Sequence, residues 1–342
     1  MARAFHALSV ALALILAGCQ LPGGSPGAPG MARSILAYTA AHEFALVHNS
    51  AVAGRVDGDF VAARAQFTAD GRFAFAVEGG GHLVVIDSQN GDVRAFPAAS
   101  ETPVAEDASA VVWFEAPDRL MRMDLAADRP EPELRQNIQL PDSGTPRTEG
   151  PEPEVRVLGV SAGGVLLART ECPCDAERHA HLYLVGSDRV VQDLGVPATG
   201  AVSAPQLSAD DGRLAYATNV ASGADCETST VVQVDLVSGI VGTSAVGDGC
   251  GPIDHLWWGD VGSLFAAADD GGGVPAVWKH GAGGWSLVEP GPVLEKRSLR
   301  TGDTAVLVPA TDSAGPATLA IDAGEQRTEL AAGVATIAVQ PS

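Results

Sequence analysis

The chain has 342 residues, of which 46% are hydrophobic and 5% aromatic, and it contains 40 Gly and 22 Pro. This composition is too apolar for an intrinsically disordered protein and is typical of a folded, turn-rich one. The formal net charge of −21 at pH 7 excludes nucleic acid as an expected partner, because binding to a phosphate backbone requires clustered Lys and Arg.

Residues 1–18 have the features of a secretory signal peptide. Arg3 supplies the positive charge, and residues 8–17 (LSVALALILA) form an apolar core that is too short to span a membrane stably. The segment ends in Leu16-Ala17-Gly18-Cys19, which resembles the bacterial lipobox. This resemblance implies cleavage before Cys19 and attachment of diacylglycerol to its thiol, with palmitate among the acyl chains. The alternative is a signal without lipid, in which the cysteine occurs by chance.

Residues 19–33 are expected to form a tether. The stretch 20–30 (QLPGGSPGAPG) is rich in Pro and Gly and cannot build a packed core. With the lipobox, it predicts a protein that is exported to the bacterial cell envelope and anchored to a membrane by lipid. The folded body would then comprise residues 34–342.

The folded body shows short apolar alternations separated by turn residues, which is typical of antiparallel strands and hairpins. In residues 206–241 the turn 208–212 (SADDG) precedes a strand at 213–218 (RLAYAT). In residues 66–96 the sequence Thr68-Ala69-Asp70-Gly71-Arg72 stands at the equivalent place.

These Ser/Thr-x-Asp-Gly-Lys/Arg turns before an apolar strand resemble those of the TolB-type, WD-repeat-like β-propellers. The resemblance implies an all-β fold of four-stranded antiparallel blades. TolB proteins also carry an N-terminal α/β domain, for which the stretch between Cys19 and Ser34 has no room.

The two ends of the folded body complement each other. Residues 35–39, 44–48 and 52–56 predict three strands without an innermost partner, and residues 334–339 (VATIAV) predict one strand without a blade. Together they make one four-stranded blade, and such a closure removes exposed sheet edges. Seven blades would have about 44 residues each, within the propeller period of ~40–45, whereas six would need about 51. We therefore predict a seven-bladed propeller, with six blades as the alternative.

Four further cysteines fall in loops expected on one face of the propeller. In an exported protein, cysteines in an even number favour disulfides, so we expect two bridges of undetermined connectivity. The alternative is a zinc site of four thiolates, although a Cys-Pro-Cys spacing is tighter than the usual two-residue spacing of ligands. The residues are Cys172, Cys174, Cys226 and Cys250.

Histidines and acids fall in or beside loops of the same face and form a candidate ligand face. They come from several blades, and no pair has the spacing of a zinc enzyme, so solvated loop residues are the simpler interpretation. No cofactor and no metal site are predicted, although a divalent metal is an alternative. The residues are His42, Glu43, Glu78, His82, His179, His181 and Asp225.

Two other segments have a structural interpretation. His255-Leu256-Trp257-Trp258 is expected to begin an innermost strand, whose rings fill the space between blades rather than stack on a sugar or cofactor. Residues 269–273 (DDGGG) are expected to form a hairpin tip, because a calcium loop would need alternating oxygen ligands.

The sequence contains no H-E-x-x-H, P-loop or dinucleotide-binding glycine pattern. Catalytic residues are therefore not assigned, and the chain is expected not to be an enzyme. We expect a lipid-anchored propeller that binds a protein, peptide or envelope component through its loops. The alternative is a propeller enzyme, lactonase- or hydrolase-like, with a central acidic metal site.

Overall fold

The structure is a computed structural model that describes residues 35–61, 63–97, 102–141, 154–171, 179–221, 227–247, 251–310 and 317–341. All of these belong to one compact unit, Arg33–Ser342. Their regular elements are strands, and no helix among them is long and apolar enough to cross a membrane. The predicted signal peptide, Cys19 and the tether lie outside the described residues, as do Cys172, Cys174, Cys226, Cys250 and Asp225.

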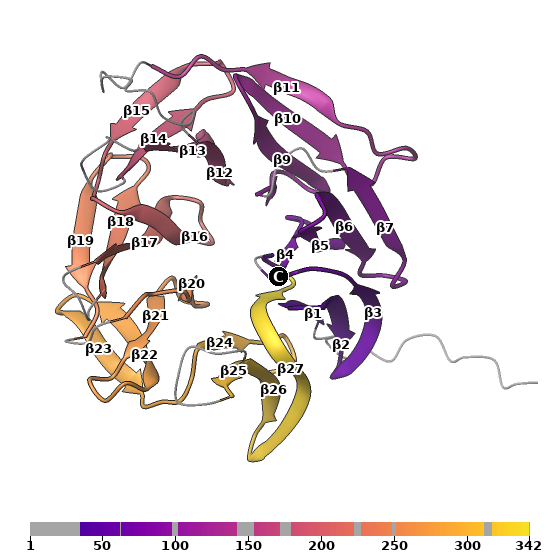
Figure 1. Cartoon of the computed structure of the whole chain (residues 1–342), viewed down its shortest axis with the longest axis vertical. Helices are drawn as coiled ribbons and strands as arrows, with labels where there is room; N and C mark the ends of the chain where they lie inside the picture. Colours follow the sequence, from indigo (N-terminus) through magenta and orange to yellow (C-terminus); the bar gives the residue numbers. More distant parts are fainter. Residues whose placement is uncertain are drawn as a thin grey trace, which may run out of the picture. The chain divides into compact units, whose positions relative to one another are not determined.

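Five sheets of four antiparallel strands each form blades one to five (Figure 1). Blade one contains β4 (Gln66–Phe67), β5 (Phe73–Glu78), β6 (His82–Asp87) and β7 (Val93–Pro97). Blade two contains β8 (Val104–Ala105), β9 (Ala110–Glu115), β10 (Arg119–Asp124) and β11 (Glu133–Asn137). Blade three contains β12 (Glu154–Ser161), β13 (Gly164–Glu171), β14 (His179–Val185) and β15 (Val191–Gly195). Blade four contains β16 (Ala201–Leu207), β17 (Arg213–Ala221), β18 (Glu227–Asp235) and β19 (Val241–Ala245). Blade five contains β20 (Leu256–Trp258), β21 (Leu264–Asp269), β22 (Pro275–Gly281) and β23 (Gly284–Glu289).

A seven-stranded sheet supplies the two remaining blades, because β27 serves both. Blade six contains β24 (Glu295–Ser298), β25 (Thr304–Pro309), β26 (Ala317–Ala323) and the first half of β27 (Gln326–Val339). Blade seven contains the second half of β27 with β1 (Ile35–Ala40), β2 (Glu43–His48) and β3 (Ala51–Asp57).

The pairing of β27 closes the ring. Its first half pairs with β26, whereas its second half pairs with β1, from Val334 opposite Ala40 to Val339 opposite Leu36. The sequence predicts a strand of its own at 334–339, but β27 begins at Gln326 and runs through these residues without a break (Figure 1). Counting β27 in both blades gives the predicted seven-bladed, all-β propeller.

Seven hydrophobic clusters lie between neighbouring blades, one for each interface of a closed seven-membered ring. Between blades six and seven, for example, Leu307 and Leu319 pack with Leu36 and Ile337. Alternate side chains of a strand point to opposite faces of its sheet, so each blade contributes to two clusters. The burial that holds the ring together is therefore distributed over all seven interfaces.

The Asp-Gly turns that carry the resemblance have the same hydrogen bonds in blades one and four. Thr68 Oγ1 donates to Asp70 and accepts from the Phe73 amide at 3.1 Å, and Ser208 Oγ makes the corresponding bonds to Asp210 and from the Arg213 amide. In each turn, the residue three positions after the Thr or Ser has a positive φ, and this residue is Gly71 in blade one and Asp211 in blade four. The SADDG turn, which has the same length, thus places its second Asp, not its Gly, where φ is positive.

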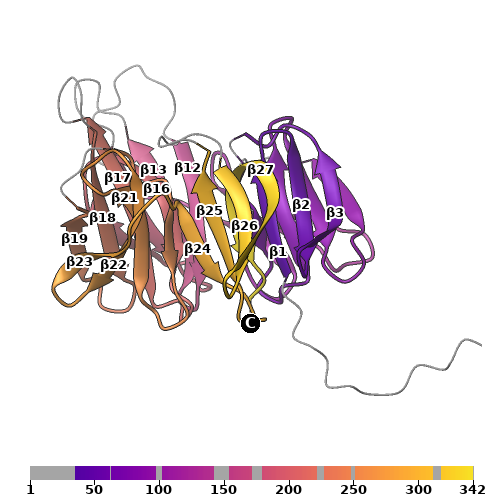
Figure 2. The ribbon, with the colours of Figure 1, turned by 90° about the horizontal axis from the view of Figure 1, so that it is seen from below.

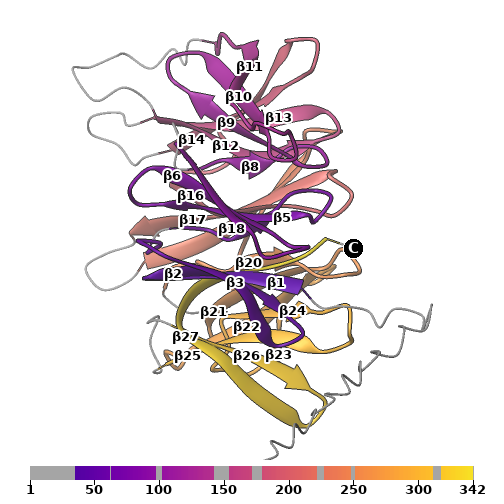
Figure 3. The ribbon, with the colours of Figure 1, turned by 90° about the vertical axis from the view of Figure 1, so that its right-hand side faces the viewer.

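The antiparallel order gives the ring two distinct faces, which Figures 2 and 3 show edge-on. Connections between the second and third strands of a blade lie on one face, together with the segments that lead to the next blade. We call this the loop face. The hairpins that join first to second and third to fourth strands lie on the opposite face.

Candidate functional site

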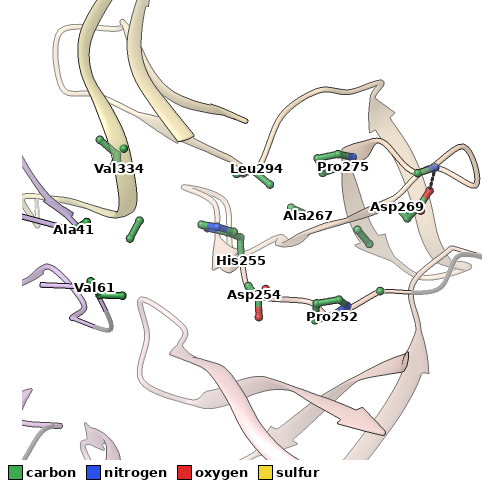
Figure 4. Close-up of a pocket in the computed structure, with 15 residues that line it drawn as sticks. Ala41, Val61, Pro252, Asp254, His255, Ala267, Asp269, Pro275, Leu294 and Val334 are labelled. Atoms are coloured by element: carbon green, nitrogen blue, oxygen red, sulfur yellow. Dashed lines mark hydrogen bonds between the residues drawn. The ribbon is translucent and has the colours of Figure 1, made fainter. Parts of the chain in front are cut away.

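A cavity of about 670 Å³ opens on the loop face. Its wall comes from Ala41 in the β1–β2 connection, Val61 in the β3–β4 connection, residues 251–255 before β20, and residues 333–335 of β27 (Figure 4). Much of the wall is apolar. The apolar side chains in it are Ala41, Val61, Pro252, Ala267, Ala268, Pro275, Leu294, Val334 and Ala335.

His255 brings a polar group to this wall, and the buried carboxylate of Glu295 holds it. His255 Nδ1 lies 3.1 Å from Glu295 Oε2, and Arg297 Nε donates to Glu295 Oε1 at 2.6 Å. Glu295 is only 5% exposed. Burial alone would raise the pKa of Glu295, but the charge of Arg297 and the contacts of His255 outweigh it and lower the pKa.

The ionised state of Glu295 fixes the role of the imidazole. A carboxylate can only accept hydrogen bonds, so the proton of neutral His255 belongs on Nδ1. Nε2 is then the nitrogen left to accept a hydrogen bond, as in carboxylate–histidine pairs at binding and catalytic sites. This arrangement can orient a polar group of a ligand or act as a general base.

Two aspartates complete the polar part of the cavity. Asp254 is exposed, next to His255. Asp269 Oδ1 accepts from the amides of Gly271 at 2.6 Å and Gly273 at 2.8 Å, both of which have positive φ. Asp269 therefore stabilises the hairpin tip that the sequence predicts between β21 and β22.

The tryptophans after His255 pack between blades, as the sequence predicts. Trp257 is 2% exposed and stacks on Phe265 with ring centroids 5.7 Å apart. Trp258 donates from Nε1 to the Gln206 carbonyl at 3.3 Å, and the guanidinium of Arg213 lies 4.5 Å from its ring centroid. Neither ring is placed to stack on a ligand in the cavity.

The candidate residues of blades seven and one form local pairs rather than one site. Tyr38 donates its hydroxyl proton to Glu43 at 2.7 Å, and burial and this bond raise the pKa of Tyr38. His82 Nδ1 lies 3.7 Å from Glu78 Oε2 on the loop face. His42 is exposed beside the cavity-lining Ala41.

The two candidate histidines of blade three converge on a buried carboxylate. Glu171 Oε2 lies 3.2 Å from His179 Nε2, and Glu171 Oε1 lies 3.9 Å from His181 Nδ1. Arg169 pairs with the same Glu171 oxygen at 2.9 Å. His181 Nε2 contacts Asp193 at 2.6 Å. This cluster ties β13, β14 and β15 together and is separate from the residues that line the cavity.

The sequence analysis thus identifies the histidines and acids of the loop face, but it does not identify the His255–Glu295 pair at the cavity. It places His255 at an innermost strand, yet does not link it with Glu295, which lies 40 positions away in the chain. Among the residues that the structure describes, no group of three or more His, Cys, Asp or Glu is arranged to hold a metal ion.

Comparison with known proteins identifies the fold. No family model matches the chain, and no curated protein matches it. A solved structure of a candidate 6-phosphogluconolactonase from Bacteroides fragilis matches with a TM-score of 0.55 at 10% identity, over 92% of this chain and 99% of that one. The WD40 propeller domain of Doa1 matches with a TM-score of 0.51 at 13% identity, over 81% and 86% of the two chains.

TolB from Acinetobacter baumannii also matches, with a TM-score of 0.45 at 14% identity, over 84% of this chain and 68% of that one. The likenesses to the 6-phosphogluconolactonase-type structure and to the Doa1 propeller, with the four-stranded sheets, confirm the predicted WD-repeat-like propeller. Propellers of this shape include binding modules and proteins with enzyme names, so the fold alone does not select a function.

Proposed function

We propose that this chain is a non-enzymatic binding propeller that holds a protein, peptide or envelope component at its loop face. The observation that carries the proposal is the cavity of about 670 Å³, which connections from separate blades build together. Its apolar wall fits an apolar side chain of an extended partner segment, and His255 supplies one directed hydrogen-bonding group. Concave, mostly apolar sites with few polar groups are typical of ligand binding.

Site-specific photo-crosslinking tests this proposal. A photoreactive residue at Val61, which lines the cavity and is 65% exposed, should yield discrete crosslinked products in cell-envelope fractions. Val237, 89% exposed in the β18–β19 hairpin on the opposite face, is the matched control and should yield none. Equal crosslinking at both positions, or none at Val61, would count against a binding site on the loop face.

The proposal includes a lipid anchor at Cys19 that places the propeller at a membrane of the bacterial cell envelope. The lipobox and the Pro/Gly-rich tether support it. Cys19→Ser should release the protein from the detergent phase or block its processing. Unchanged partitioning of this variant would refute lipidation at Cys19.

A lactonase- or hydrolase-like activity is the second candidate, favoured by the His255–Glu295 pair at the cavity wall. The purified protein would be assayed with lactones and esters, alongside His255→Gln as the variant that lacks the base. Turnover that depends on His255 would support an enzyme. If no lactone or ester is hydrolysed faster with the protein than in buffer, the enzymatic alternative is refuted and the binding function remains.

A further inference from the structure

A second cavity, of about 450 Å³, lies between blades one and two on the face opposite the loop face. Its wall comes from the turn before β5, the β6–β7 hairpin with the start of β7, and the β10–β11 hairpin. Arg72 and Arg94 bring two guanidinium groups to this wall, and Val93 and residues 125–127 give it an apolar side. The volume is within the range of ~300–1,000 Å³ that is usual for small-molecule sites.

One aromatic ring holds both guanidinium groups. Cζ of Arg72 lies 4.8 Å from the ring centroid of Phe73, and Cζ of Arg94 lies 5.1 Å from the same centroid. Cζ of Arg94 also lies 5.8 Å from the ring centroid of Phe96. Phe73 is fully buried in the hydrophobic cluster between blades one and two. Contacts between cations and aromatic rings are favourable, so both guanidinium groups are held at the cavity by the folded chain itself.

Both arginines have hydrogen-bond donors to spare. Arg72 Nη2 lies 3.4 Å from Asp87 Oδ2, a long contact, and Arg72 Nε is buried without a hydrogen-bond partner among the described residues. Arg94 donates from Nη2 to the Leu125 carbonyl at 2.8 Å. A guanidinium carries five N–H donors, so these contacts leave donors of both groups for a ligand.

The arginine at the equivalent position of blade four is used differently. Arg213 follows the SADDG turn as Arg72 follows its own turn, and Arg213 Nη2 donates to the Gly262 carbonyl of blade five at 3.4 Å. Its guanidinium also lies over the ring of Trp258 in that blade. Arg213 therefore joins two blades, whereas Arg72 makes no hydrogen bond to blade two within the described residues and lines the cavity instead.

Two aspartates also line this cavity and determine which anion suits it. Asp87 Oδ1 accepts from the Gln89 amide at 2.8 Å, and Asp92 Oδ2 accepts from Asn90 Nδ2 at 2.8 Å. The hairpin thus holds both carboxylates, and their charges offset those of the two arginines. A ligand with one negative charge is repelled less by them than a phosphate dianion. A planar carboxylate also matches the fork of a guanidinium.

We propose that Arg72 and Arg94 form a carboxylate-binding site, which takes a small monocarboxylate with a short apolar body. The carboxylate accepts hydrogen bonds from the two guanidinium groups, and the apolar body packs against Val93 and residues 126–127. This site is separate from the cavity of the loop face and does not depend on the binding function proposed for that face.

Calorimetric titration of the full folded protein with butyrate tests the site. Butyramide, an uncharged compound of similar shape, and inorganic phosphate are titrated separately, with sodium chloride at matched ionic strength as the reference. Butyrate should bind and should raise the melting temperature above the chloride reference, because a ligand of the native state stabilises it. Butyramide should not bind, and phosphate should bind more weakly than butyrate. Tighter binding of phosphate than of butyrate overturns the assignment to a carboxylate.

Arg72→Gln and Arg94→Gln should each weaken butyrate binding by roughly tenfold or more, since each loses charge-assisted hydrogen bonds to the carboxylate. Arg213→Gln is the matched control, because it changes the equivalent arginine of blade four, and it should bind butyrate like wild type. A wild type that binds butyrate no better than butyramide overturns the proposal. Equal binding by wild type and both folded variants overturns it as well.

A second readout separates ligand binding from packing. Butyrate should raise the melting temperatures of wild type and Arg213→Gln by the same amount, whatever the melting temperature of each without ligand. The same butyrate concentration should leave Arg72→Gln and Arg94→Gln nearly unchanged. A shift in Arg94→Gln equal to that of wild type would mean that Arg94 serves only packing against Phe73 and the bond to Leu125, and the proposal would be wrong.

Discussion

The hydroxyl oxygens of Thr39 and Thr336 lie 2.8 Å apart where β1 meets β27. Thr39 Oγ1 donates to the Ala63 carbonyl, so the proton between the two threonines must come from Thr336. Thr336 Oγ1 in turn accepts from the Ala65 amide. The result is one directed hydrogen-bond chain that joins the first strand, the last strand and the connection into blade one.

Thr336→Val should lower the free energy of unfolding by about 1–3 kcal/mol, because the isosteric side chain leaves the Ala65 amide without its acceptor. Chemical denaturation of both proteins measures the difference. Thr328→Val, at an exposed position in the first half of β27, is the control and should change stability by less than about 0.5 kcal/mol. Equal effects of the two substitutions would show that the chain of hydrogen bonds contributes nothing specific.

Ending the chain at Gly333 should abolish cooperative folding. It removes the pairing with β1 and the buried side chains of Val334 and Ile337, which are 1% and 5% exposed. Losses of roughly 2–5 kcal/mol for each large buried aliphatic rival a typical total stability of about 5–15 kcal/mol.

A chain that ends at Val339 keeps this pairing and is the control for the truncation. It loses only contacts such as that of Gln340 Nε2 with the Gly71 carbonyl at 2.7 Å. Thermal unfolding and size-exclusion chromatography compare the two truncated chains. A Gly333 chain that melts near the wild-type temperature would mean that closure by β27 is dispensable.

Many strands were predictable, because short apolar runs bounded by turn residues are typical of strands, including those that are buried on both faces between neighbouring blades. Residues 35–39 and 213–218 correspond to β1 and β17 with small shifts at the ends. The continuity of β27 was not predictable, since Ala331 to Gly333 carry little strand preference and Gly333 adopts a positive φ.

The candidate site was predictable only in part. A pattern can place His255 at an innermost strand, but the partner Glu295 comes from the next blade, and the two meet only when the ring is assembled. Side chains that converge from different blades need the three-dimensional register of the blades.

Glu295→Gln should destabilise the protein at pH 7 by about 1–3 kcal/mol, because it removes the buried carboxylate that His255 and the partly buried Arg297 contact. The pKa of Glu295 is lower in the folded chain than its ordinary value of 4.5. Its stabilising contribution is therefore present above about pH 4.5 and is lost as the pH falls through the folded pKa.

The acid side of the stability profile should accordingly be flatter for Glu295→Gln than for wild type. Denaturation at a series of pH values measures this slope. Glu329→Gln, at an exposed position of β27, should leave both stability and slope unchanged. If the free energy of unfolding of Glu295→Gln falls with decreasing pH as steeply as that of wild type, Glu295 does not couple protonation to folding.

The four cysteines after Cys19 lie outside the described residues, but the strands on either side of their loops are described. Glu171 pairs with His179 across the loop that holds Cys172 and Cys174, and Ala221 pairs with Glu227 across the loop that holds Cys226. Cys250 precedes Gly251 at the cavity. The strand ends that flank these two loops lie at the loop face of neighbouring blades, and Cys250 falls in the sequence between blade four and blade five.

We therefore propose two disulfides among Cys172, Cys174, Cys226 and Cys250 that join blades three to five. A bridge between Cys172 and Cys174 would be strained, so one thiol of this pair should reach Cys226 and the other Cys250. Mass spectrometry of the alkylated, non-reduced protein should find no free thiol among the four, and reduction should cost roughly 2–4 kcal/mol for each bridge. Alkylation of all four before reduction would refute the bridges, and zinc released in proportion to those thiols would favour the four-thiolate site instead.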